Sequence, residues 1–212
     1  TEALRALPKL GFAGTNITLP HKQAALEVVD EVGERARRIG AVNTVIVRDD
    51  GSLLGTNTDG FGFIENIRDR APDWQAAAGP ALVIGAGGAA RAIIAALLDA
   101  GAPAIQLTNR TEARAADLAA EFGAALSVVP WAARSKAVAG AATVVNTTSL
   151  GMAGQPALDL DLTALPATAL VTDIVYAPLE TSLLSAAAAR GNTTVDGLGM
   201  LLHQARPGFA AW

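Results

Sequence analysis

The chain has 212 residues, of which 51% are hydrophobic and 17% are charged, with a formal net charge of -4. This balance indicates a globular protein of one large or two small domains, and it offers no basic field to nucleic acid. The absence of cysteine excludes disulfides, thiolate nucleophiles and cysteine zinc sites, and two histidines are too few to favour another transition-metal site. No apolar run approaches the ~20 residues of a bilayer span, so we expect a cytoplasmic protein without a membrane contact.

The first residues, from Thr1 to Arg5, show neither an initiator methionine nor the basic-then-apolar pattern of a signal peptide. They have the composition of the middle of a helix. We therefore expect the sequence to be a fragment that lacks an N-terminal segment.

A short strand is predicted over residues 12–19, followed by a helix for which Pro20 suits the first turn. Gly33 is suited to end that helix. Its buried side would consist of Leu26, Val28, Val29 and Val32.

The next segment reads as a hairpin and a helix. Residues 41–48 are rich in β-branched residues and predict a strand, and Asp50-Gly51 is a hairpin turn signal that returns the chain through Leu53-Leu54. A helix is predicted from Asp59 to Arg70. Its inward side would consist of Phe63, Ile64 and Ile67.

Residues 71–80 contain two prolines and read as a linker, after which apolar strands alternate with helices. The predicted strands are 81–85, 104–109, 126–129, 142–147, 169–175 and 193–196, and the predicted helices are 89–99, 111–122 and 182–190. This alternation is typical of a parallel sheet covered on both faces. We predict an α/β protein of two domains joined near residue 75, the second of them a doubly wound Rossmann-type domain.

The turn between the first two elements of that second domain is rich in glycine. Gly85 permits the tight backbone, Gly87 lets a pyrophosphate approach main-chain N–H groups, and the helix that begins near Gly88 directs its positive end at the phosphates. Ala90 takes the place of the usual third glycine. A purely structural turn is the alternative, but the preceding strand and the following helix favour a dinucleotide site.

The end of the second strand distinguishes NADP from NAD. An NAD enzyme usually carries Asp or Glu there to bind the ribose 2′-hydroxyl, whereas this chain has Thr108-Asn109-Arg110-Thr111, with Arg114 one helical turn on. Two guanidinium groups favour the 2′-phosphate of NADP. The alternative is that Arg110 and Arg114 form a solvated helix face.

Three polar segments in the first half are candidates for acid–base chemistry: residues 14–22, 40–44 and 57–60. If their strands are neighbours, Lys22, Asn43 and Asp59 converge at one end of the sheet. A lysine beside a carboxylate supplies the proton that carbonyl reduction requires. On spacing alone, a solvated Lys22 and an Asp59 that caps its helix are the default interpretation.

A series of short motifs follows in one order along the chain: residues 16–22 (NITLPHK), 40–44 (GAVNT), 57–60 (NTDG), 85–89 (GAGGA), 109–111 (NRT), 146–152 (NTTSLGM), 173–178 (DIVYAP) and 196–204 (DGLGMLLHQ). Together these segments resemble shikimate dehydrogenase. They cover essentially the whole chain.

The resemblance implies NADP-dependent reversible reduction of 3-dehydroshikimate to shikimate, in the pathway to the aromatic amino acids. It implies Lys22 as the catalytic acid/base with Asp59 as its partner, and substrate contacts from Thr18, Asn43, Asp59, Tyr176 and Gln204. The implied cofactor residues are Gly85, Ala86, Gly87, Gly88 and Ala89 at the pyrophosphate, Asn109, Arg110, Thr111 and Arg114 at the adenosine phosphate, Ile174, Gly197 and Met200 near the nicotinamide, and Glu34.

The resemblance also implies domain boundaries. Residues 1–70 would form the substrate domain, rejoined by a C-terminal helix over 198–212, and residues 71–197 the NADP-binding domain. A monomer or a homodimer is compatible with the sequence. The alternatives are a relative that also accepts quinate with NAD, and an NADP-binding module without catalysis.

One feature of the family is missing. The family carries an early Ser-x-Ser segment that binds the substrate carboxylate, and nothing before Gly14 matches it. We therefore expect a substrate domain that is incomplete at its N-terminus, with cofactor binding retained and turnover weak. A missing sheet edge would also expose apolar surface.

Overall fold

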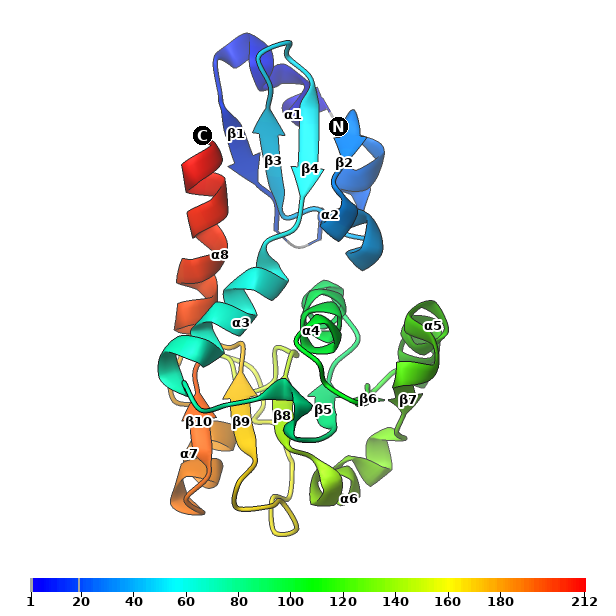
Figure 1. Cartoon of the computed structure of the whole chain (residues 1–212), viewed down its shortest axis with the longest axis vertical. Coiled ribbons are helices and arrows are strands. Elements are labelled where there is room, and N and C mark those ends of the chain that lie inside the picture. Colours follow the sequence, from blue (N-terminus) through cyan, green and yellow to red (C-terminus); the bar gives the residue numbers. More distant parts are fainter. Residues whose placement is uncertain (1, 19) are drawn as a thin grey trace.

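The computed structural model describes residues 2–18 and 20–212 of the chain. Two sheets lie at opposite ends of an elongated molecule, a four-stranded sheet near the two chain termini and a six-stranded sheet at the other end (Figure 1). Helices α3 (Asp59–Arg70) and α8 (Leu198–Ala211) lie between them. Among the described residues, no helix is long and apolar enough to cross a bilayer.

The four-stranded sheet has the order β1-β3-β4-β2, in which β2 is parallel to β4 and the other neighbours are antiparallel. Its strands are β1 (Gly14–Asn16), β2 (Glu31–Val32), β3 (Thr44–Val47) and β4 (Leu53–Thr56). The predicted hairpin joins β3 to β4, and Gly51 takes a left-handed φ of 81° in its turn. β1 covers only part of the predicted strand 12–19, in which Leu19 lies outside the described residues.

The prediction of a helix after Pro20 is wrong. The chain forms a 3-10 turn over Ala24–Glu27 and then β2, and Gly33 precedes a helix, α2 (Glu34–Ile39), where we had expected it to end one. The reason is the open edge of β4, whose carbonyl groups at Leu53 and Gly55 accept hydrogen bonds from the N–H groups of Asp30 and Gly33, each at 2.9 Å. Pairing with that edge satisfies backbone groups that a helix would have left exposed on β4.

The six-stranded sheet is parallel throughout, with the order β10-β9-β8-β5-β6-β7. Its strands are β5 (Ala81–Ile84), β6 (Ile105–Thr108), β7 (Leu126–Val128), β8 (Thr143–Asn146), β9 (Leu170–Asp173) and β10 (Thr193–Val195). The chain runs outward in one direction from β5 to β7 and in the other from β8 to β10. The predicted Rossmann-type topology is confirmed, and its switch point lies between β5 and β8.

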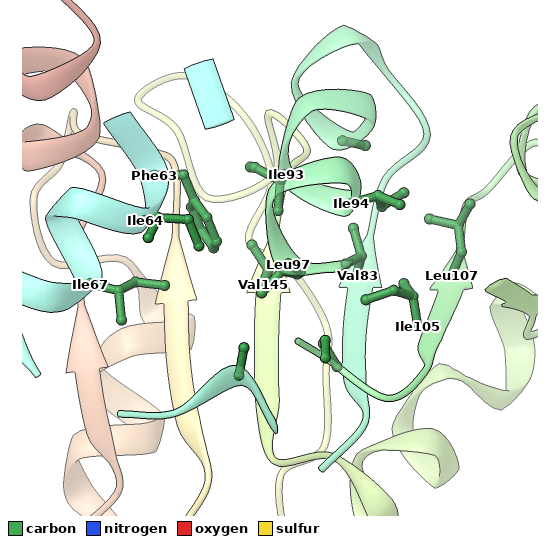
Figure 2. Close-up of a cluster of buried hydrophobic side chains, with 14 of the residues drawn as sticks. Phe63, Ile64, Ile67, Val83, Ile93, Ile94, Leu97, Ile105, Leu107 and Val145 are labelled. Atoms are coloured by element: carbon green, nitrogen blue, oxygen red, sulfur yellow. The ribbon is translucent and has the colours of Figure 1, made fainter. Parts of the chain in front are cut away.

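Helices cover both faces of this sheet. Between the strands of this sheet the chain forms α4 (Gly88–Asp99), α5 (Glu112–Phe122), α6 (Arg134–Ala137) and α7 (Ser182–Ala189). Helix α1 (Glu2–Ala6) belongs to the other end of the molecule, where Leu4 packs with the smaller sheet. Figure 2 shows one face, where Phe63 of α3 and Ile93 of α4 pack with strand residues such as Val83 and Val145. On the other face, Leu183 and Leu184 of α7 belong to a second buried cluster. The central strands β5, β8 and β9 therefore contribute apolar side chains to both buried clusters, as expected of a parallel sheet covered on both faces.

The predicted linker lies against the larger sheet. The indole N–H of Trp74 donates a hydrogen bond of 3.0 Å to the Thr143 hydroxyl at the start of β8. The segment between β7 and β8, for which the sequence patterns predict no element, forms 3-10 turns on both sides of α6.

Helix α8 carries the chain back from the larger sheet to the smaller one. Its backbone passes so close to α3 that a Cβ on Gly62 would lie 2.6 Å from the carbonyl oxygen of Met200. At its end, the indole N–H of Trp212 donates to the carbonyl oxygen of Val45 in β3 at 3.1 Å. The return of the C-terminal helix to the first sheet, which the family resemblance implied, is present in the structure.

Candidate functional site

A buried ion pair lies where the first sheet meets α3. The ammonium Nζ of Lys22 is 2.6 Å from Oδ2 of Asp59, and the two side chains are 15% and 4% exposed. Asp59 is the first residue of α3, where the positive end of the helix stabilises a carboxylate. Both groups are largely removed from water, so the loss of either partner would leave an uncompensated charge in the interior.

Asn43 connects this pair to two other elements. Its Nδ2 donates to the second oxygen of Asp59, Oδ1, at 2.8 Å, and to Oε1 of Gln204 on α8 at 3.0 Å. Its own Oδ1 accepts from the backbone N–H of Thr58 at 2.9 Å. A side chain that is 1% exposed thus orients a carboxylate from α3 and an amide from α8.

Backbone hydrogen bonds fix the segment that carries Lys22. The N–H of Val42 donates to the carbonyl oxygen of Lys22 at 2.8 Å, and the N–H of Ile17 donates to that of Asn43 at 2.7 Å. The three polar segments that we singled out in the sequence therefore lie side by side, which is the condition under which Lys22, Asn43 and Asp59 were expected to converge. The lysine is not a solvated surface residue, and Asp59 does not cap its helix, because Thr58 occupies the cap position.

Two further predicted substrate residues, Thr18 and Tyr176, have exposed side chains. Thr18 is exposed and follows β1, on the same segment as Lys22, and its carbonyl oxygen accepts from the N–H of His21 at 2.9 Å. Tyr176 follows β9 in the six-stranded sheet and is 50% exposed. The roles of these residues, like those of Lys22 and Asp59, stay predictions.

The glycine loop has the geometry expected of a dinucleotide site. Gly85 has a φ of 109°, and a Cβ there would lie 2.6 Å from the Thr147 hydroxyl, so only glycine fits between β5 and the segment after β8. A Cβ on Gly87 or Gly88 would meet nothing within 4 Å. Gly87 occupies the cap position of α4 without a side-chain cap. The start of this helix therefore opens onto free space at the switch point of the sheet.

The tip of β6 carries the residues predicted for the adenosine phosphate. Oδ1 of Asn109 accepts from the backbone N–H of Ala86 at 3.2 Å, and its Nδ2 donates to the carbonyl oxygen of Thr111 at 2.8 Å, so Asn109 links the glycine loop to the end of β6. Arg110 and Arg114 are exposed. Within residues 2–18 and 20–212, neither arginine takes part in an ion pair.

The residues predicted near the nicotinamide lie together. A Cβ on Gly197 would be 2.3 Å from the carbonyl oxygen of Ile174, and Ile174 packs against the core cluster that contains Met200. Glu34 lies elsewhere, exposed in the first turn of α2.

Sequence reasoning assigned no role to a group of buried polar residues beside this site: Asn146, Asp173 and Thr181. The segments that begin at Asn146 and Asp173 are among those that carry the family resemblance, but no single-residue signal distinguishes them. Burial raises the pKa of the Asp173 carboxyl, and hydrogen bonds from Val175, Asn146 and Thr181 oppose that increase.

The doubly wound sheet, the open glycine loop at its switch point and the Lys22–Asp59 pair define a two-sheet α/β protein of the class of dinucleotide-dependent oxidoreductases. Residues 1–45 match the shikimate dehydrogenase substrate binding domain, and residues 69–153 match shikimate / quinate 5-dehydrogenase. The chain belongs to the shikimate dehydrogenase family.

Relatives cover nearly the whole chain. Shikimate dehydrogenase (NADP(+)) of Paramagnetospirillum magneticum is 61% identical over 209 residues, a match that spans 99% of this chain and 76% of that protein. The protein of the same name from Rhodospirillum rubrum is 63% identical over 215 residues, which again span 99% of this chain and 76% of the relative. Such relatives are NADP-dependent oxidoreductases by name.

Solved structures agree on the fold. Quinate dehydrogenase from Corynebacterium glutamicum in complex with NAD has a TM-score of 0.93 at 37% identity, over 99% of this chain and 76% of that one. Shikimate 5-dehydrogenase from Thermus thermophilus in complex with NADP(H) and shikimate has a TM-score of 0.87 at 41% identity, and the match covers 100% of this chain and 76% of that one. The first of these complexes contains NAD, and the second contains NADP(H) and shikimate.

Proposed function

We propose that this protein interconverts 3-dehydroshikimate and shikimate with NADP(H). The observation that carries the proposal is the buried Lys22–Asp59 pair, 2.6 Å apart, beside the amides of Asn43 and Gln204. A polyhydroxylated ring requires several hydrogen-bonding groups around one proton donor, and this cluster supplies them. The high identity to named shikimate dehydrogenases supports the same substrate.

The residues at the glycine loop fit a dinucleotide. The space above Gly87 admits a pyrophosphate, and the free N–H groups at the start of α4 attract its charge. Arg110 and Arg114 would hold the 2′-phosphate, with Thr111 nearby, and the absence of a carboxylate at the tip of β6 favours NADP over NAD. Glu34, Ile174, Gly197 and Met200 complete the proposed cofactor site.

In the direction of reduction, NADPH when bound supplies hydride to the carbonyl carbon. The Lys22 ammonium then donates a proton to the carbonyl oxygen, which becomes the hydroxyl, and Asp59 keeps the lysine oriented toward that oxygen. In the direction of oxidation, the neutral Lys22 amine accepts the hydroxyl proton. Asn43 holds Asp59 on its other oxygen, and Thr18, Tyr176 and Gln204 are proposed to bind the ring hydroxyls.

We also propose that the two sheets correspond to two functional domains. Residues 1–70 with helix 198–212 would bind the substrate, and residues 71–197 would bind NADP. The location of the acid–base cluster on the first sheet and of the glycine loop on the second supports this division.

The test is shikimate-dependent reduction of NADP, followed by absorbance, with quinate and NAD as the competing substrate and cofactor. Lys22→Met should lower kcat by about 10²- to 10⁴-fold, the usual contribution of a positioned acid/base. Lys136→Met, which removes an exposed lysine, should leave kcat unchanged. Full turnover in Lys22→Met, or NADP binding without any oxidation of shikimate in a version extended to the length of the relatives, would refute the proposal.

A further inference from the structure

The buried carboxylate of Asp173 lies at the end of β9 and takes no part in the mechanism above. Asp173 is 1% exposed and pairs in register with Asn146 of β8. Its Oδ1 accepts from Nδ2 of Asn146 and from the backbone N–H of Val175, both at 3.0 Å, and its Oδ2 accepts from the hydroxyl of Thr181 at 2.8 Å. All three donors are uncharged, so no opposite charge offsets the cost of burying this carboxyl group.

The partners of Asp173 lie at the two ends of one loop. Val175 is at the start of the segment between β9 and α7, and Thr181 is at its end, where its hydroxyl also accepts from the N–H of Leu184 and caps α7. One carboxylate therefore holds both ends of residues 174–181. Nδ2 of Asn146 bonds the carbonyl oxygen of Leu150 at 3.0 Å as well, which connects this loop to the segment after β8.

The same loop carries two residues of the proposed site. Ile174 and Tyr176 flank Val175, whose N–H is held by Asp173 and whose carbonyl oxygen accepts from the N–H of Gly197 at 3.2 Å. Because both backbone polar groups of Val175 are engaged, the chain that carries Tyr176 has little freedom, although the tyrosine side chain itself is half exposed.

We infer that Asp173 is a positioning residue that holds the loop 174–181 in place, so that Tyr176 meets the substrate and Ile174 meets the nicotinamide. This inference rests on the proposed function for the roles of Tyr176 and Ile174. In this inference, Asn146 and Thr181 hold the Asp173 carboxylate in its position beside the loop.

The experiment compares Asp173→Asn, Thr181→Val and Thr181→Ser with the unaltered chain. Asp173→Asn and Thr181→Val should lower kcat/KM for shikimate by roughly 10-fold or more, with the Kd for NADP within about twofold, because a small displacement of a contact residue slows turnover more than it weakens cofactor binding. Thr181→Ser retains the hydroxyl and should restore kcat/KM. Asp161→Asn is the matched control, because Asp161 also accepts from a threonine hydroxyl and a backbone N–H but is exposed and remote.

Amide hydrogen exchange gives a readout that does not require turnover. Exchange in a peptide covering residues 174–181 should accelerate in Asp173→Asn and Thr181→Val and not in Thr181→Ser or Asp161→Asn. Unchanged exchange and kinetics would overturn the inference, and so would a parallel loss of kcat/KM, NADP affinity and thermal stability, which indicates general unfolding. If a version extended to the length of the relatives oxidises no shikimate, the proposed function fails, while the exchange comparison still decides whether Asp173 holds the loop.

Discussion

The carboxylate of Asp59 is shared between Lys22, which contacts its Oδ2 at 2.6 Å, and Asn43, which donates to its Oδ1 at 2.8 Å. The lysine and the asparagine come from different segments of the first sheet, and the aspartate comes from the first turn of α3. With both of its oxygens engaged, Asp59 orients the lysine in one direction. The ammonium of Lys22 is thus held in one position before a substrate arrives, as its proposed role as proton donor requires.

Asp59→Asn should separate this orienting role from binding of the cofactor. The substitution keeps the shape but removes the charge opposite the ammonium, so we expect kcat/KM for shikimate to fall by about 10²-fold or more while NADP affinity is retained. Steady-state kinetics together with NADP titration measure both quantities. Glu65→Gln is the control on the same helix, since Glu65 forms its ion pair within the described residues with the exposed Arg68. Wild-type kinetics in Asp59→Asn would show that the pair has no catalytic role.

Arg110→Ala and Arg114→Ala should weaken the binding of NADP and leave that of NAD unaltered. A hydrogen bond to a charged group contributes about 1.5–3 kcal/mol, so each variant should raise the Kd for NADP by roughly 10- to 100-fold. Binding titrations with both dinucleotides test this selectivity. Arg35→Ala removes another exposed arginine and should change neither affinity. An equal loss for NADP and NAD would mean that the arginines do not read the 2′-phosphate.

Alanine at two glycines of the same loop should affect two different properties, stability at Gly85 and NADP affinity at Gly87. Gly85→Ala places a side chain at a φ of 109° and 2.6 Å from the Thr147 hydroxyl, so the free energy of unfolding should fall by about 1–3 kcal/mol. Gly87→Ala has an ordinary φ of -97° and open space, so stability should be unchanged while the affinity for NADP falls. Thermal unfolding and NADP titration of both variants distinguish the two effects. Tight NADP binding by Gly87→Ala would place the pyrophosphate elsewhere.

The Asp173 carboxyl should make the protein less stable as pH rises. Its pKa is raised above the ordinary 3.8 by burial, so the unfolded chain releases this proton at a lower pH than the folded protein does. The stability contribution is complete below pH 3.8 and declines as pH increases toward the folded-state pKa. Asp173→Asn should therefore gain stability relative to the unaltered chain over that interval, as measured by denaturant unfolding at a series of pH values.

Asp161→Asn should change the pH dependence of stability in the opposite direction. Hydrogen bonds from Thr163 lower the pKa of the exposed Asp161 carboxyl, so its contribution is present above pH 3.8 and is lost as pH falls through the folded-state pKa. If both variants shifted the pH profile of stability in the same direction, the origin assigned to the Asp173 shift would be incorrect.

Local signals in the sequence predict the cofactor half of the molecule well. The β5–α4 turn can be recognised from the sequence alone, because glycine at positions 85 and 87 directly after an apolar strand is typical of a dinucleotide-binding turn. The edge strand β2 was missed because the choice between helix and strand at residues 24–33 depends on the unpaired edge of β4, some twenty residues further along the chain.

The acid–base pair and the buried network were less accessible to sequence reasoning. The three polar segments placed Lys22 beside Asp59 only on the condition that their strands are neighbours, and the family resemblance implied the pair directly. Nothing in the sequence itself states that two residues 37 positions apart meet. Asn146, Asp173 and Thr181 are residue types that also suit caps and turns, and only the register between β8 and β9 brings them together.

The hydrogen bond between Asn43 and Gln204 joins residues separated by 161 positions. During synthesis, a ribosome that has released the first sheet and α3 has exposed the lysine and its aspartate, but the entire six-stranded sheet must still emerge before α8 can arrive. The contact between Asn43 and Gln204 therefore forms only after the six-stranded sheet that separates them along the chain has been synthesised. A nascent protein halted before α8 would already contain the complete glycine loop but would lack the amide of Gln204 beside Asn43.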